Sequence, residues 1–443
     1  MASISLASPS HRQRWFVAGV LLFFAAINVQ YVVKIHHFEK RSAILRWQNQ
    51  IHDFGAGINI WEKHTYPNPP IMALLLQPLM MLPPLGVSLV WFYLKVIMTL
   101  CAIHWVFRMV ETPTQSFPVW GKALAFVLSL RPIEGDLTHG NINLYILFLV
   151  VAALYLFFRG KDAMGGIVLA LAIACKLTPA LFVPYFLWKR AWRMLAGCTA
   201  GLALFFFLVP GLFVGMETNV RYLRSWVNNM ITPFVVGNEV TSEHNNQSLP
   251  GLAARMLTHQ PSFTTYDSNL QKIPVAYHNF ASLEPKVVGW MLKGCLLLFA
   301  AVVVWSCRTP LAQRGAWPMV AEFSIVILGM LLFSERTWKH HCVTLLLPFT
   351  VLAYYLAAVR EGDGPSARYG VAALLAATVL LMLSTSTSDI GNHERFGEMA
   401  QVYGAYVWAF MLLIAALVLV LRRTGSRAPA WAVAGQERRP VPR

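Results

Sequence analysis

The sequence predicts an all-α integral membrane protein, a polytopic bundle of about 12 transmembrane helices. Its 443 residues are 57% hydrophobic and 13% charged, whereas an ordinary soluble domain is roughly one quarter charged. The mean hydropathy of +0.53 agrees with this imbalance, so most of the chain needs a bilayer as its solvent. The six cysteines all lie within or beside apolar runs, which argues against a disulfide framework and a cysteine-rich metal site.

Apolar runs with about the length needed to cross the hydrocarbon core define the expected spans. These runs are 15–33, 86–107, 122–133, 142–158, 163–175 with 177–188, 195–214, 287–306, 318–333, 342–359, 369–386 and 403–421. Pro179 and Pro184 interrupt 163–188, which is either a pair of tightly packed helices or one kinked helix. No small-residue cleavage site follows the first run, so we expect a retained helix and not a signal peptide.

Lys and Arg are concentrated in the short connections, which predicts the orientation of the bundle. With the N-terminus inside, Arg12, Arg14 and the short basic connections lie in the cytoplasm, as does the C-terminus. Both termini lie on the same side only if the number of spans is even, which requires that 69–84 does not cross the membrane. The segment is bracketed by paired prolines and is only ~15 residues long, so we expect a helix lying in the outer interface.

The larger polar segments then lie on the outer face, at 34–85, 215–286, 334–341 and 387–402. Because loops on a rigid scaffold carry most chemistry, we expect the function on this face. The predicted organisation is one transmembrane domain over 1–423 and a disordered cytoplasmic tail at 424–443, rich in Arg, Pro, Ala and Gly. We therefore expect a multi-pass protein of the plasma membrane whose site is extracytoplasmic.

The first outer segment contains one aspartate, Asp53, next to His52. A carboxylate near the membrane surface can act as a general base that takes the proton from an attacking hydroxyl group. Alternatively, Asp53 caps the helix that follows, since aspartate is favoured at that position. The residue alone does not decide between these interpretations.

A second polar group lies in RPIEGDLTHGNINLYILF, between two short spans. Ionisable side chains near membrane depth are costly and indicate function. The alternative is a surface turn in which Arg131 bonds to an acidic neighbour. The polar residues of this group are Arg131, Glu134, Asp136, His139, Asn141 and Asn143.

Two further segments carry cations. Lys176 lies between apolar runs, where it either snorkels to the outer interface or holds a phosphate as a point charge. The segment SERTWKHHC places Arg336, Lys339, His340 and His341 on the face where positive charge is normally disfavoured, which suits a phosphodiester or pyrophosphate. The alternative is ordinary basic flanking residues, and adjacent histidines are poor zinc ligands because they point in different directions.

Six segments, in this order, resemble glycosyltransferase family 87 of the membrane GT-C glycosyltransferases. They cover roughly 45 to 350, and the family includes polyprenyl-phosphate-mannose-dependent mannosyltransferases. Two departures concern YPNPP, where the family has YPP, and His139, where it usually has Gln. The segments are DF in the first outer segment, YPNPPIMALLLQPLMMLP, HGNINLYILF, GIVLALAIACKLTPALFVPYFLWKRAWR, NNQSL and WKHHCVTLLLP.

The resemblance implies a GT-C-type bundle with interfacial helices in the first outer segment and Asp53 as the catalytic residue. Donor phosphate would be bound by Lys176, His340, His341 and Arg336. The substrate cavity would include His52, Tyr66, Arg131, His139, Asn141, Asn246 and Gln247.

The expected reaction transfers a hexose, mannose above all, from a polyprenyl-phosphate donor to a hydroxyl group of a glycolipid or glycan, with inversion. Membrane lipids are the other expected partners; no nucleic acid, cofactor or metal is expected, since phosphate is already a good leaving group. A lipid-linked-sugar flippase remains an alternative, although such transporters show repeat symmetry that we do not find. A non-catalytic membrane subunit, which needs no buried acid, is the other alternative.

Overall fold

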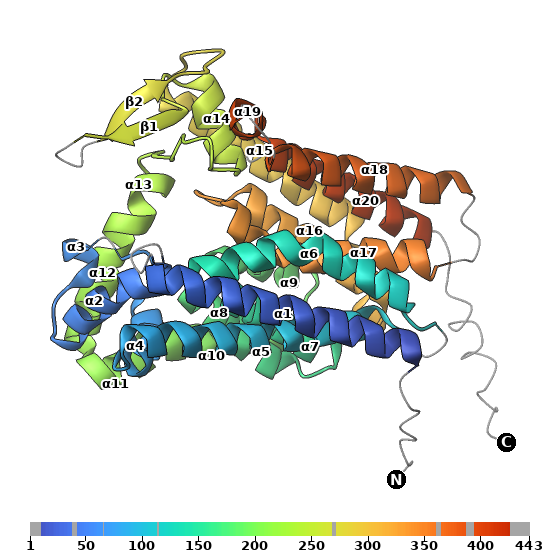
Figure 1. Ribbon diagram of the computed structural model, residues 1–443, viewed down its shortest axis with the longest axis horizontal. Coiled ribbons are helices and arrows are strands. Elements are labelled where there is room, and N and C mark those ends of the chain that lie inside the picture. Colours follow the sequence, from blue (N-terminus) through green and yellow to red (C-terminus); the bar gives the residue numbers. More distant parts are fainter. Residues whose placement is uncertain are drawn as a thin grey trace, which may run out of the picture.

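The computed structural model describes residues 10–37, 42–64, 66–112, 115–267, 272–359, 365–386 and 394–425. The regular secondary structure of these residues is helical apart from one short hairpin, which confirms the predicted all-α class (Figure 1). Seven helices in this part of the chain are long and apolar enough to cross a membrane, which confirms a multi-pass membrane protein. Shorter apolar helices accompany them, and the expected number of about 12 spans stays a prediction.

The first part of the chain supplies five long helices that run roughly parallel to one another (Figure 1). Proline at the first position of α5 costs no hydrogen bond, because the first amides of a helix lack intrahelical partners. Helix α6 is longer than the expected run 122–133 and includes the polar segment that we expected between spans. Its end is set by Gly140, whose φ of 65° is left-handed. The five are α1 (His11–His37), α5 (Pro84–Val110), α6 (Val119–His139), α7 (Asn143–Phe158) and α8 (Asp162–Cys175).

The segment 163–188 forms two consecutive helices joined at Lys176. They do not pack tightly against each other, so neither the tightly packed pair nor the single kinked helix that we expected is found. Helix α8 ends at Cys175, and Lys176 is extended, with φ −156° and ψ 123°. A short 3-10 turn, η2 (Thr178–Leu181), then leads into α9 (Phe182–Trp188). The next helix is continuous through a π-helical stretch and consists of α10 (Trp192–Leu202), η3 (Ala203–Leu208) and α11 (Val209–Val214).

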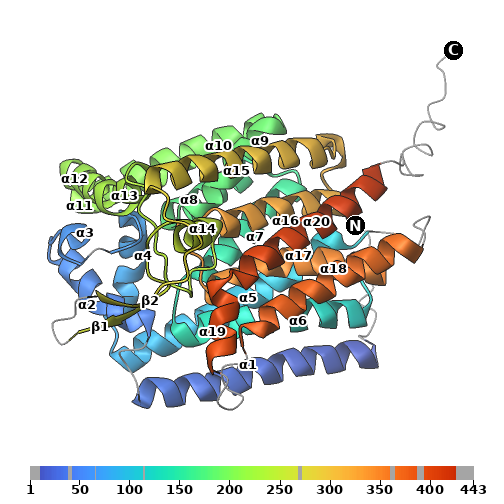
Figure 2. The same cartoon turned by 90° about the horizontal axis from the view of Figure 1, so that it is seen from above.

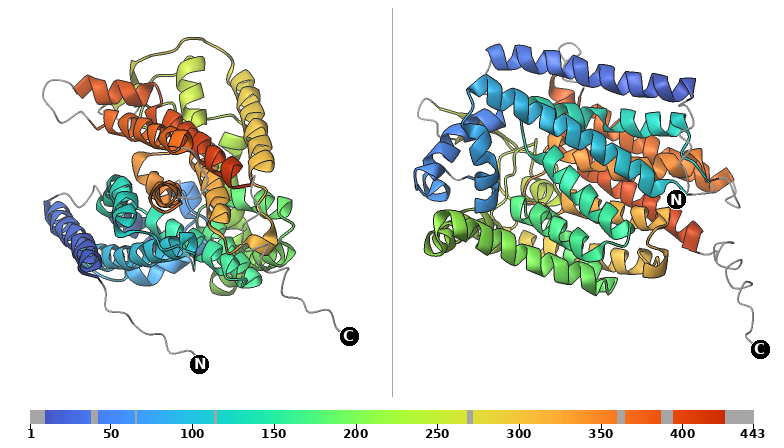
Figure 3. Two further views of the ribbon diagram at one scale, coloured as in Figure 1. Left: turned by 90° about the vertical axis from the view of Figure 1, so that its right-hand side faces the viewer. Right: turned by 90° about the horizontal axis from the view of Figure 1, so that it is seen from below.

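The second part of the chain completes the bundle around α16. Every residue of α16 from Met319 to Leu332 is buried, so this helix is enclosed by its neighbours. Helices α15 and α1 lie on opposite flanks of the bundle (Figures 2 and 3). The elements are α15 (Pro285–Ser306), η5 (Leu311–Gln313), α16 (Trp317–Leu332), η6 (Lys339–Leu345) with α17 (Leu346–Ala357), α18 (Pro365–Ser384) and α20 (Ala405–Gly425).

One end of the bundle is covered by short helices and a hairpin, while α1 begins and α20 ends at the other end (Figure 1). The segment 69–84, expected to lie in the outer interface, contains α4, which is too short to span a bilayer. Its position in the interface stays a prediction. The expected outer segment 387–402 is described from 394 onwards, and 426–443 of the expected tail lies outside the described residues. The covering elements are α2 (Ala43–Gly55), α3 (Ile60–Lys63), α4 (Pro70–Met80), α12 (Met216–Trp226), η4 (Val227–Ile231), α13 (Thr232–Val235), α14 (Leu249–Leu257), antiparallel β1 (Phe263–Tyr266) and β2 (Lys272–Ala276), and α19 (Glu394–Val402).

Helices α8 and α10 approach so closely that glycine is required between them. A Cβ atom on Gly166 would lie 2.1 Å from the Met194 carbonyl oxygen, and one on Gly197 would lie 2.1 Å from the Ala163 carbonyl oxygen. Small residues are the usual means by which membrane helices pack backbone to backbone. This contact holds α8, and with it Lys176 at the end of α8, in a fixed position.

We expect Gly197→Ala to destabilise the protein, because the new methyl group must push α8 and α10 apart. Overpacking of this kind costs about 1–3 kcal/mol, and the loss should appear as a lower melting temperature in detergent. The control is Gly294→Ala, since a Cβ there has no heavy atom within 4 Å. Equal melting temperatures for the two variants would contradict the close packing of α8 on α10.

Candidate active site

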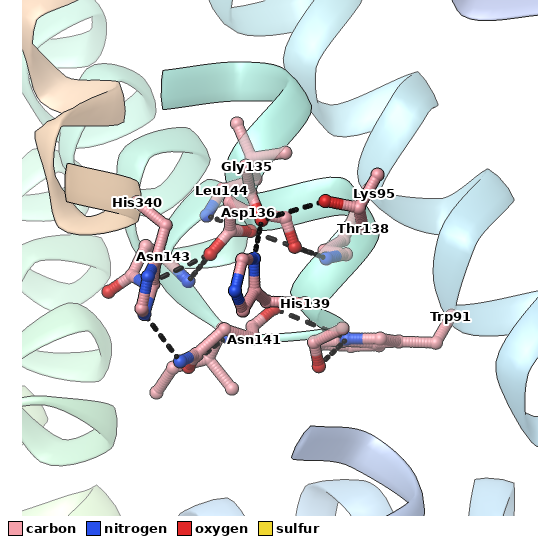
Figure 4. Close-up of polar contacts among 12 residues, drawn as sticks. Trp91, Lys95, Gly135, Asp136, Thr138, His139, Asn141, Asn143, Leu144 and His340 are labelled. Carbon is pink, nitrogen blue, oxygen red and sulfur yellow. Dashed lines mark hydrogen bonds and ion pairs between the residues drawn. The ribbon is translucent and has the colours of Figure 1, made fainter. Parts of the chain in front are cut away.

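A buried carboxylate, Asp136, lies one turn before the end of α6 (Figure 4). Its Oδ1 accepts hydrogen bonds from the backbone and side-chain nitrogens of Asn143, at 3.2 and 2.9 Å. Its Oδ2 accepts from the Leu144 amide at 3.2 Å and pairs with the Lys95 ammonium group at 3.3 Å. Asp136 therefore caps α7 from the neighbouring helix, where the helix dipole favours a negative charge, and its own charge is balanced by Lys95.

Asn143 connects this carboxylate to Lys176. The Lys176 ammonium group donates a 2.6 Å hydrogen bond to Asn143 Oδ1. Lys176 also lines a pocket of about 20 Å³, which is enough for one ordered water molecule. Lys176 is therefore held at this small pocket by Asn143, which argues against a side chain that snorkels freely to the surface. The other polar residues around this pocket are Asn143, Thr178, Ser334, Thr337, His341 and Thr344.

Three histidines from two distant segments meet beside the pocket. The rings of His139 and His340 stack with centroids 4.9 Å apart, and His139 Nδ1 donates to the Gly135 carbonyl at 2.6 Å. Asn141 Oδ1 accepts from the Ile142 amide, so the Asn141 NH₂ group faces His340 Nε2 at 3.1 Å. His340 Nε2 is therefore an acceptor and its ring is neutral. His341 Nδ1 donates to the Arg336 carbonyl, and its ring lines the same pocket as Lys176.

Asp53 lies in the last turn of α2, within the covering layer. Its Oδ2 accepts from Lys63 at 2.7 Å and from His64 Nε2 at 2.5 Å. These two contacts, the His64 hydrogen bond first, hold the pKa of Asp53 below its usual value. The next helix, α3, is capped by Asn59, whose side chain accepts from the Trp61 amide, so the interpretation of Asp53 as a helix cap is wrong. The side chain of Asp53 is 25% exposed and can be reached from outside.

Tyr66 is buried in the aromatic core of the first covering segment. Its ring lies between Trp47 and Trp61, with centroid distances of 6.0 and 6.2 Å. Burial raises the pKa of Tyr66, and the neighbouring Cys175 thiol adds to this effect. Helix α4 of the same segment packs against α8, which ends at Cys175 directly before Lys176, so the first covering segment lies next to the lysine end of the pocket.

Two residues expected in the substrate cavity, Asn246 and Gln247, form hydrogen bonds within the protein. Asn246 donates to the Thr241 and Glu335 carbonyls and accepts from the Thr337 amide. Gln247 donates to the Gln401 carbonyl and accepts from the Tyr406 amide. Both side chains are buried, so they fix the segment before His340 against the covering layer and present no free polar group to a substrate.

Three other expected site residues lie on the surface. His52 is exposed beside Asp53. Arg131 is exposed and pairs with Glu134, as the surface alternative for this residue predicted. Arg336 bonds to Thr241 Oγ1 and borders a polar cavity of about 810 Å³ between the covering segments. Charged and hydrogen-bonding residues around this cavity include Asn229, Glu239, Glu243, Lys272, Tyr277 and Glu335.

Lys95 is the main participant that sequence reasoning left out of the site. Its only signal was a lysine inside an apolar span, and an ionisable residue there indicates a functional or structural partner. Its partner, Asp136, is 41 positions further along the chain, so no local pattern joins them.

A helical membrane bundle that gathers a carboxylate, a lysine and histidines beneath short covering helices has the architecture of a membrane-embedded transferase. Residues 66–334 match the model of glycosyltransferase family 87, and the chain belongs to this family. The predicted family and the glycosyltransferase class are thereby confirmed over the flippase and subunit alternatives.

Characterised relatives agree with this assignment. A polyprenol-phosphate-mannose-dependent alpha-(1-2)-phosphatidylinositol mannoside mannosyltransferase of Mycobacterium tuberculosis is 25% identical over 94% of this chain and 92% of its own length. A Mycolicibacterium smegmatis protein of the same name is 27% identical over 66% of this chain and 59% of its own length. An alpha-(1->3)-arabinofuranosyltransferase of Corynebacterium glutamicum is 30% identical over 30% of each chain. No solved structure matches the chain significantly.

We expect Lys95→Met to destabilise the protein strongly, because it leaves the Asp136 carboxylate buried without its counter-charge. Breaking a buried pair in this way costs about 3–5 kcal/mol, measured by unfolding in detergent. The double variant Lys95→Met/Asp136→Asn removes both charges and should be more stable than Lys95→Met alone. If the losses of the two single variants simply add in the double variant, the proposed pairing is wrong.

Proposed function

We propose that the protein transfers a hexose, mannose first of all, from a polyprenyl-phosphate donor to a hydroxyl group of a glycolipid or glycan on the extracytoplasmic face. One observation carries the proposal: an accessible carboxylate, Asp53 on α2, and a lysine–histidine pocket lie at the same end of the bundle, where α4 packs against both α2 and α8. The names of the mycobacterial relatives, which specify a polyprenol-phosphate-mannose donor, support this choice of donor.

In this mechanism Asp53 is the general base. It accepts the proton of the acceptor hydroxyl, whose oxygen attacks the anomeric carbon of the donor sugar. The bond from that carbon to the phosphate oxygen breaks, polyprenyl phosphate leaves with the electron pair, and the configuration inverts. Proton removal by a positioned carboxylate contributes typically 10²–10⁴-fold to such reactions.

Lys176 and His341 are suited to contact the leaving phosphate once the bound donor widens their pocket, whose resting volume of about 20 Å³ takes a single water molecule. Charge grows on the phosphate oxygens as the glycosidic bond breaks, and a preorganised ammonium group in a water-poor pocket stabilises that charge strongly. Asn143 holds Lys176 at 2.6 Å, so the lysine does not need to reorganise during the reaction. Phosphate is a good leaving group, so the mechanism needs no metal ion.

The resting partners of Asp53 must change when the acceptor binds. Lys63 is half exposed and is the partner that an incoming hydroxyl group can displace. Loss of Lys63 raises the pKa of Asp53 toward its usual value, which strengthens the carboxylate as a base. The acceptor's sugar groups fit the polar cavity between the covering segments, where carboxylates and the Tyr277 ring suit a polyhydroxyl ligand.

We expect Asp53→Asn to lower kcat by about 10²-fold or more, because the amide keeps the shape of the side chain but cannot take the proton. The assay measures transfer of radiolabelled mannose from polyprenyl-phosphate mannose to extracted lipids, in the presence of EDTA. Arg46→Gln is the control, being exposed on the same helix as Asp53 and outside the expected site, and should keep wild-type activity.

The possible outcomes separate the parts of the proposal. Turnover that survives in Asp53→Asn would remove Asp53 as the base but keep the donor. Transfer by the wild type from an arabinose or glucose donor, and not from the mannose donor, would overturn the choice of mannose. In that case the Asp53 comparison is repeated with the active donor.

We expect His64→Gln to move the acid limb of the pH profile of kcat/KM to higher pH. The pKa of Asp53 is lowered by its partners, the His64 hydrogen bond first, so in the wild type the carboxylate stays ionised to a lower pH than an ordinary aspartate does. Removing His64 takes away the largest lowering contact, and protonation then begins at higher pH. An unchanged acid limb, in a variant that remains folded at each pH, would show that Asp53 does not control this limb.

A further inference from the structure

A second pocket, lined by both basic and apolar residues, lies at the opposite end of the bundle from Asp53. It opens between the end of α9 and the segment that joins α15 to α16, and its volume is about 430 Å³. Helix α9 follows η2, next to Lys176, and ends at Trp188, so the bundle separates this pocket from the candidate active site. The residues that define it are Trp188, Lys189, Arg190, Cys307, Arg308 and Thr309.

The floor of this pocket is fixed by a buried carboxylate, Glu322 of α16. Glu322 Oε2 accepts from the Lys189 ammonium group at 2.6 Å and from the Tyr185 hydroxyl at 2.8 Å. Its Oε1 accepts from the Thr309 amide at 2.6 Å. Lys189 also donates to the carbonyls of Cys307 and Thr309. The charge of Lys189 is therefore used inside the protein, and three elements are held together beneath the pocket.

Unlike Lys189, the two arginines at the rim of the pocket have no carboxylate partner in the part of the chain that the structure describes. Arg190 and Arg308 are exposed, and no carboxylate in the described ranges forms an ion pair with either of them. Arg190 has a φ of 54°, a left-handed conformation that few residues other than glycine adopt. Two guanidinium groups on a rigid floor, without counter-charges, form a site for an anion that accepts paired hydrogen bonds, as phosphate does.

The surroundings indicate that the phosphate belongs to a lipid. Helix α15 lies on the flank of the bundle (Figure 3), and its exposed surface beside the pocket is apolar. Leu297 and Leu298 are 72% and 68% exposed, as expected of residues that contact acyl chains. Trp188 and Trp305 are partly exposed at the pocket end of their helices, where tryptophan is enriched at the level of lipid headgroups.

We propose that this pocket binds the phosphate of an anionic phospholipid through Arg190 and Arg308, with the acyl chains along α15. The site is independent of the transferase reaction, because it shares no residue with the pocket of Lys176 and His341. The same phosphate chemistry is available from free inorganic phosphate, so the test separates the two sources.

The test compares phosphatidylglycerol and phosphatidylcholine with the same acyl chains, added to the purified full-length protein and followed by native mass spectrometry. The wild type should retain more phosphatidylglycerol than phosphatidylcholine. The variant Arg190→Gln/Arg308→Gln should weaken this binding about tenfold or more, as expected for loss of hydrogen bonds to a charged group. The matched control is Arg159→Gln/Arg193→Gln, which removes two exposed arginines from the same end of the bundle but outside the pocket.

Three results would overturn the proposal. They are equal binding of the two lipids by the wild type, an equal loss in the control variant, and unchanged binding in the pocket variant. Inorganic phosphate that binds through the two arginines, without a preference for phosphatidylglycerol, would assign the site to free phosphate instead. If the glutamine variant is poorly folded, Arg190→Lys/Arg308→Lys keeps the charge and should still weaken binding, because lysine lacks the planar fork of arginine.

Discussion

The buried charge of Asp136 is the constraint on which the end of the bundle around Lys176 depends. A carboxylate removed from water is tolerated only when other groups supply its hydrogen bonds and its counter-charge. Here those groups come from α5, through Lys95, and from the first turn of α7. Three helices are thereby fixed at one point, and Asn143 extends the arrangement to Lys176. The position of Lys176 thus follows from the way that the protein accommodates one acidic side chain.

Much of the fold could be predicted because the bilayer imposes it. Runs such as 86–107 and 287–306 are long and apolar for one reason, the thickness of the hydrocarbon core, and α5 and α15 are found there. The extent of α6 could not be predicted in this way. Its last two turns are polar, and they are helical because their side chains find partners on α5, α7 and η6, which no local pattern reveals.

The sequence allowed most residues of the candidate site to be predicted, but only part of the way in which they are arranged. Lys176, His340 and His341 stood out because cations are costly where they lie, and the structure brings them together around one polar region. Asn246 and Gln247 stood out as a motif, yet all their bonds lie within the protein. A sequence motif indicates that the structure or the function requires these side chains. Whether they bind a ligand or the protein backbone depends on partners that are distant in the sequence.

In the proposed mechanism, the contacts of Asp53 with Lys63 and His64 favour sugar transfer over hydrolysis of the donor. Water is always present at the outer surface and can compete with an acceptor for the same activated sugar. In the resting protein the carboxylate already binds Lys63 and His64, so a lone water molecule finds the base occupied and weakened. A larger acceptor has more contacts with which to displace Lys63. In the proposed mechanism the enzyme thus wastes little of its lipid-linked donor, because the base becomes strong only when the correct acceptor is bound.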